Sequence, residues 1–116
     1  MTATQTRSRF EPAAMLVQWQ RYTSHANVTR ENPIHFAQDR LTRELSGTLM
    51  QENGMPESLA MTIAGAVVDE LSPMFQKGQL PPHSTNRQLE QTARSAADKW
   101  FKSQRQETEN ILGSLF

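Results

Sequence analysis

The segment Ser58–Phe75, SLAMTIAGAVVDELSPMF, decides the fold of this chain. Leu59, Ile63, Val67 and Leu71 recur every four residues, a spacing that places them on one face of an α-helix. Alanines and a further valine widen this face, so that more than one side of the helix requires cover. The segment therefore predicts a strongly apolar helix and favours an all-α fold.

Three further helices are predicted on either side of this segment. The first spans roughly residues 12–25, and the second begins at the Asn32-Pro33 capping signal and stops at Asn53-Gly54. Pro73 is predicted to end or kink the apolar helix. The last helix is predicted over residues 85–112, with Gly113 breaking it.

These elements predict one small helical bundle of about four helices. Residues 1–10 are polar apart from Phe10 and are predicted to form a disordered N-terminal tail, while 11–116 form a single helical domain. Only 36% of the 116 residues are apolar, so the core is thin for one chain. We therefore expect the bundle to be a homodimer, in which a second copy covers part of the apolar surface.

Composition disfavours some classes of protein and excludes others. Lys plus Arg and Asp plus Glu number 12 each, a balance that disfavours binding to nucleic acid or an anionic membrane. The chain has no cysteine, which removes disulfides and thiolate metal sites, and no stretch approaches a membrane span. No signal-peptide pattern follows the first residues, so a cytoplasmic location is expected.

Residues suited to catalysis or metal binding do not form a recognisable set. His25, His35 and His83 are not spaced three or four apart, and Asp69 and Glu70 are neighbours whose side chains diverge on a helix. The glycines are isolated and form no phosphate-binding loop. We therefore expect neither an enzyme nor a cofactor or metal.

Two alternatives to a protein-binding function stay open. Arg94, Lys99, Lys102 and Arg105 accompany Trp100 and Phe101 in the last helix, a pattern that also fits a helical DNA-associated accessory protein. Acidic residues interrupt this pattern, which favours a solvated mixed face. The second alternative is a structural homo-oligomer, in which self-association consumes the apolar helix.

The apolar helix is the surface that we predict to bind a partner. An apolar face that the small core leaves uncovered would substitute for a contact of the partner with itself. The predicted partner-binding residues are Leu59, Ile63, Val67, Glu70, Leu71 and Phe75. The competing interpretation is that this helix lies at the centre of an ordinary bundle and is wholly buried.

The length of the chain, the order of its helices and the stretch SLAMTIAGAVVDELSPMF resemble the QslA family, small quorum-sensing antiactivators of pseudomonads. The resemblance spans the whole chain. It implies a helical homodimer that binds the ligand-binding domain of LasR, a LuxR-type transcription activator, and blocks its dimerisation and so its DNA binding. It assigns no contact residues, so the six partner-binding residues above come from the helical pattern alone.

Overall fold

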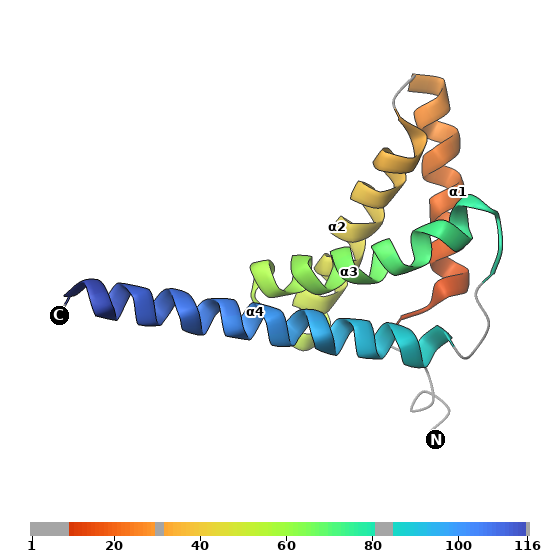
Figure 1. Cartoon of the computed structure of the whole chain (residues 1–116). Coiled ribbons are helices and arrows are strands. Elements are labelled where there is room, and N and C mark those ends of the chain that lie inside the picture. Colours follow the sequence, from red (N-terminus) through yellow and green to blue (C-terminus); the bar gives the residue numbers. More distant parts are fainter. Residues whose placement is uncertain (1–9, 30–31, 81–84, 116) are drawn as a thin grey trace.

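The computed structural model describes residues 10–29, 32–80 and 85–115, and all regular secondary structure in these ranges is helical. The four helices are α1 (Pro12–Thr29), α2 (Pro33–Asn53), α3 (Glu57–Gln76) and α4 (Thr85–Leu115). Helix α3 lies between α2 and α4, and α1 packs mainly on α2 (Figure 1). The predicted all-α bundle of four helices is confirmed for the single chain.

Local sequence signals set several helix ends as predicted. The side chain of Asn32 accepts a hydrogen bond from the backbone N–H of His35 at 3.1 Å, and Pro33 is the first residue of α2. Gly54 ends α2 in the left-handed conformation at φ 64°, and its N–H donates to the carbonyl of Met50. These ends depend on one or two residues, which is why the sequence predicted them.

Two helices continue beyond the predicted ends. Helix α1 reaches Thr29 instead of His25, since Ala26 is fully buried and extends the packed face by a further turn. Helix α3 continues through Pro73 to Gln76. Pro73 and Asp69, the residue whose carbonyl loses its helical donor, are both exposed, so water can bind that carbonyl.

The C-terminal helix is also longer than predicted. Helix α4 passes through Gly113 and ends at Leu115, so Gly113 does not break it. A helical glycine costs only about 1 kcal/mol relative to alanine, which the preceding seven turns of an established helix can accommodate. Phe116 lies outside the described residues.

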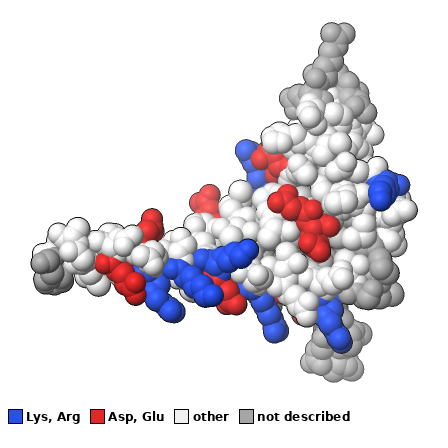
Figure 2. All heavy atoms as spheres, in the orientation of Figure 1, with Lys and Arg blue, Asp and Glu red and all other residues white. Residues whose placement is uncertain are grey.

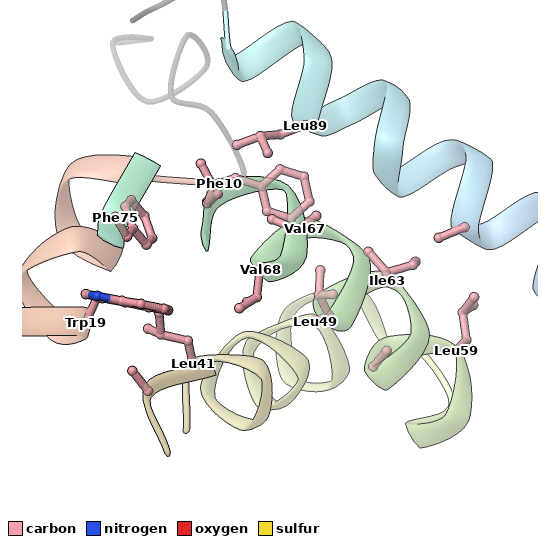
Figure 3. Close-up of a cluster of buried hydrophobic side chains, with 14 residues drawn as sticks. Phe10, Trp19, Leu41, Leu49, Leu59, Ile63, Val67, Val68, Phe75 and Leu89 are labelled. Carbon is pink, nitrogen blue, oxygen red and sulfur yellow. The ribbon is translucent and has the colours of Figure 1, made fainter. Parts of the chain in front are cut away.

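The prediction of a disordered N-terminal tail is wrong for Phe10, the last residue assigned to it. Residues 1–9 lie outside the described part of the chain, but Phe10 is only 2% exposed. Figure 3 shows Phe10 beside Val67 of α3 and Leu89 of α4. Phe10 therefore belongs to the core of the helical domain.

The core is centred on α3. Nine of its side chains are buried, among them Val67 and Leu71, which are fully inaccessible. Helix α1 reaches the C-terminal end of α3 through Trp19, whose ring lies 5.6 Å from that of Phe75. Helix α2 is joined to α3 by a hydrogen bond from Nε2 of Gln38 to Oγ of the buried Ser72, at 2.8 Å.

The molecule is extended for its size. Its radius of gyration is 16.7 Å, whereas a compact domain of this length has about 13 Å. Figure 1 shows the reason: the C-terminal half of α4 projects past the end of α3 without touching another helix. The fold therefore consists of a packed body and one projecting helical segment.

Candidate protein-binding site

The predicted partner-binding residues divide into two groups. Five of the six are buried in the core of the single chain, namely Leu59, Ile63, Val67, Leu71 and Phe75. Glu70 is the exception and is exposed. The single chain therefore does not present these five apolar side chains to a partner. Helix α3 lies at the centre of the bundle and is covered, as the competing interpretation expected.

Three helices cover these five side chains of α3. Helix α2 contributes Leu41 and Leu49, α1 contributes Trp19, and α4 contributes Leu89 (Figure 3). Each of these side chains is itself nearly inaccessible. Periodicity identified the apolar faces of α3 correctly, but it carries no information on whether the same chain covers them.

Glu70 lines a shallow groove between α3 and α4. The groove has a volume of about 530 Å³, and its other lining residues include Thr62, Ala66, Ser95 and Lys99. These side chains are small or polar, and no large apolar side chain lines the groove. It offers no anchor point for a partner, since anchors are large side chains that lose their water on binding.

A larger groove opens between α1, α2 and α4, and we call it the α1–α2–α4 groove. Its volume is about 740 Å³. The apolar side chains that line it include Phe10, Met15, Leu45, Leu49, Met55 and Ile63. Met15, Leu45 and Met55 are only partly buried. The groove thus combines a buried apolar floor with apolar side chains that still contact solvent.

Charged side chains surround this apolar floor. Glu11, Glu52, Glu90 and Arg94 all line the α1–α2–α4 groove. A smaller depression of about 240 Å³ shares its Met15 and Leu45 and adds the carboxylate of Glu44. Partial burial raises the pKa of Glu44 above its usual value of 4.5. The rim is mainly acidic, which favours a partner segment that carries basic residues.

A second unusual surface is the projecting part of α4, residues 101–115, which we call the C-terminal arm. All fifteen of its residues are exposed. Four are large and apolar: Phe101 at 54%, Ile111 at 60%, Leu112 at 49% and Leu115 at 71% exposed. A helix with this much apolar surface in water normally has a partner.

Trp100 marks the boundary between the arm and the body. Its indole N–H donates to Oγ of Ser58 at 2.7 Å, which attaches α4 to the beginning of α3. Its ring also meets that of Phe101 edge to face, with centroids 5.0 Å apart. After Trp100 every described residue of α4 is exposed, and Figure 1 shows the end of α4 projecting away from the other described helices.

The charges on α4 do not form a continuous basic surface. Figure 2 shows Lys and Arg gathered along α4, with acidic side chains nearer the free end of the arm. At about 100° per residue, Asp98 and Glu109 fall on the same side of the helix as Arg94, Lys102 and Arg105. The face is therefore mixed in sign, as expected for a solvated helix.

The described residues contain no group of three or more potential ligands that could hold a metal ion. The ring of His25 packs 5.7 Å from that of Phe36, which also lies under the guanidinium of Arg40. His83 lies outside the described residues. Among the described helices none is long and apolar enough to cross a membrane.

Comparisons with known proteins add no identification. No family model, curated protein or solved structure matches the chain. The interpretation of its surfaces therefore depends on the residues and the geometry described above.

Sequence reasoning missed both the groove and the arm. The groove joins Met15, Leu45 and Met55, which lie on α1, on α2 and in the turn after α2, so no local pattern could reveal it. The arm did leave a signal, because Phe101, Leu112 and Leu115 are spaced by eleven and three residues and share one helix face. That face extends past the end at Leu112 predicted for this helix.

Proposed function

We propose that this protein is a non-catalytic regulator that binds a segment of another protein in the α1–α2–α4 groove. The observation that supports this proposal is the groove itself, a concave apolar surface with a charged rim. A partner helix that places apolar side chains on such a floor gains affinity by removing both surfaces from water.

Two features of the lining residues suit this role. Met15 and Met55 are unbranched and polarisable, so they can adjust to the shape of an incoming side chain. Glu52 and Glu90 on the rim would attract basic residues of a partner and exclude acidic ones. The groove would therefore select an amphipathic segment with lysine or arginine beside its apolar face.

The partner class that we propose is a LuxR-type transcription activator, bound through its ligand-binding domain. The resemblance of the chain to the antiactivator family supports this partner class, and the mechanism would be competition. An activator held in the groove would be unable to pair with a second activator, and so would not bind its DNA site. Sequestration of this kind requires only a stoichiometric complex.

The test is isothermal titration calorimetry of the full chain with a purified LuxR-type ligand-binding domain. Met55→Asp places a charge among the apolar side chains that line the groove and should weaken binding by about tenfold or more. Met61→Asp is the matched control, since Met61 is an exposed methionine outside the groove and should leave affinity unchanged. Circular dichroism establishes that both variants are folded.

A second variant keeps the test decisive if Met55→Asp fails to fold. The double variant Glu52→Lys, Glu90→Lys reverses two rim charges and leaves the apolar floor intact. It should slow association, and the effect should shrink at high salt. Unchanged binding by folded floor and rim variants would exclude the groove as the site, and no heat with the wild-type chain would exclude this partner class.

A further inference from the structure

The C-terminal arm is a helix whose apolar side chains have no cover within the described chain. It is about 22 Å long, at the usual rise of 1.5 Å per residue. The packed half of α4 supplies its nucleus, yet isolated helices of this length are marginal in water. Packing against another surface would therefore stabilise both the helix and its exposed side chains.

The apolar residues of the arm lie on one face. At about 100° per residue, Phe101, Thr108, Leu112 and Leu115 fall within a narrow arc, and Ile111 lies at its edge. The opposite face is polar and contains Gln106, whose side chain donates to Oδ1 of Asn110 at 3.3 Å. The arm is therefore amphipathic, with one side suited to a helix partner.

The apolar face is complementary to itself when the direction of the helix is reversed about the level of residue 106. The reversal places Phe101 opposite Ile111, and Gln104 opposite Thr108. Large apolar residues therefore meet each other, and polar residues meet polar ones. A two-fold axis between two identical helices requires this kind of self-complementarity.

The charges of the arm select the same orientation. Lys102 and Arg105 lie in its first half, and Glu107 and Glu109 lie in its second half. Antiparallel arms bring the basic half of each copy beside the acidic half of the other. Parallel arms would place like charges together and would also put the two packed bodies at the same end.

The exposed surface leaves room for such an interface. The chain exposes 8094 Å², whereas a compact monomer of 13.2 kDa exposes about 6400 Å². The fully exposed arm contributes to this excess. A standard interface takes about 800 Å² from each partner, which is about half of this excess.

We propose that the C-terminal arm binds the arm of a second copy of this chain, antiparallel, with the two-fold axis crossing the apolar face at the level of residue 106. The residues that carry the contact are Phe101, Ile111, Leu112 and Leu115. The α1–α2–α4 groove contains none of these residues, so the arm contact and the proposed partner binding can fail independently.

The first test is analytical ultracentrifugation of the full chain over a range of concentrations. The wild-type chain should sediment at twice its mass of 13.2 kDa, and the variant Phe101→Asp, Leu112→Asp should sediment as a monomer with the same thermal stability of the body. Val17→Asp is the matched control, because Val17 is similarly exposed on α1 and should leave the dimer intact. A monomeric wild-type chain, or an unaffected dimer in the arm variant, would overturn the proposal.

Charge exchange tests the orientation. The variant Lys102→Glu, Arg105→Glu has an acidic arm, and the variant Glu107→Lys, Glu109→Lys has a basic arm. In each variant alone like charges meet, so the dissociation constant of its dimer should rise by about tenfold or more. Mixed in equal amounts, the two should form a heterodimer. If the mixture stays monomeric while the wild-type chain dimerises, the arms do not provide the contact.

Disulfide trapping gives a second measure of orientation, because the chain has no cysteine of its own. Chains with Gln104→Cys should cross-link to chains with Thr108→Cys faster than to themselves, since these positions lie opposite each other only in the antiparallel pair. Faster linking of Gln104→Cys to itself would indicate parallel arms and contradict the proposal.

Discussion

Helix α3 and the C-terminal arm are both regular helices with apolar side chains at helical spacing, but they have opposite surroundings. In α3 the residues predicted to bind a partner are covered by α1, α2 and α4. In the arm, Phe101, Ile111, Leu112 and Leu115 are all about half exposed or more. The comparison shows that spacing locates an apolar face, whereas the number of helices beside it decides whether that face is core or interface.

The strongest test of this difference uses the same substitution in both regions. Leu71→Ala removes a fully buried side chain and should lower the free energy of unfolding by about 2–5 kcal/mol. Leu112→Ala removes a side chain that is 49% exposed and should change it by no more than about 0.5 kcal/mol in the monomer. Urea unfolding at a concentration where the chain is monomeric measures both.

Equal losses from these two substitutions would contradict the division into a packed body and a projecting arm. A loss of stability in Leu112→Ala that appears only at high protein concentration would support this division, because such a dependence reports self-association and not the fold of one chain.

Substitutions at the junction between the two regions should lower the free energy of unfolding by less than Leu71→Ala does. Trp100→Phe removes the indole N–H that donates to Oγ of Ser58, and the free energy of unfolding should fall by about 1 kcal/mol. Ser58→Ala removes the same bond from the other side. In a double-mutant cycle the two losses should not add, and strictly additive losses would show that this bond does not attach α4 to α3.

The smallest expected effect concerns Glu44 on the rim beside the groove. Burial raises its pKa above 4.5, so the folded chain holds this proton more tightly than the unfolded chain, and stability falls as the pH rises through the raised pKa. Glu44→Gln should therefore gain stability relative to the wild-type chain at pH 7 and show no gain at pH 3.

Thermal unfolding of both chains from pH 3 to pH 7 measures this difference. The gain should stay within about 0.5 kcal/mol, as is usual for a surface position. A stability difference that does not change with pH would mean that the Glu44 carboxyl is not desolvated in the folded chain.

Several parts of the fold were predictable because single residues decide them. The cap at Asn32 and the left-handed Gly54 each depend on local backbone chemistry, and both ends of α2 were predicted correctly. Gly113 was predicted to break α4 and does not, and α3 continues through Pro73, which was predicted to end or kink it. Their intrinsic cost is local, whereas the helix on either side of them is stabilised by many residues.

The candidate site was less predictable than the fold. The six predicted residues came from one helix, and five of them contribute to the core instead. The α1–α2–α4 groove depends on where α1, α2 and α4 leave space between them, and Phe10 lines it although its position had been assigned to a tail. Such surfaces arise from the relative placement of helices that are distant in sequence.

Local sequence signals predicted that the described part of the chain is helical, that it forms four helices, and which residues of each helix are apolar. These properties follow from spacing, capping and turn residues, whose physical effects act over about one helical turn. The packing of the helices places α3 at the centre, leaves a groove beside it, and lets the C-terminal arm extend past the body. The burial of a side chain depends on which residues lie next to it, and for residues distant in sequence this is set only when the helices pack.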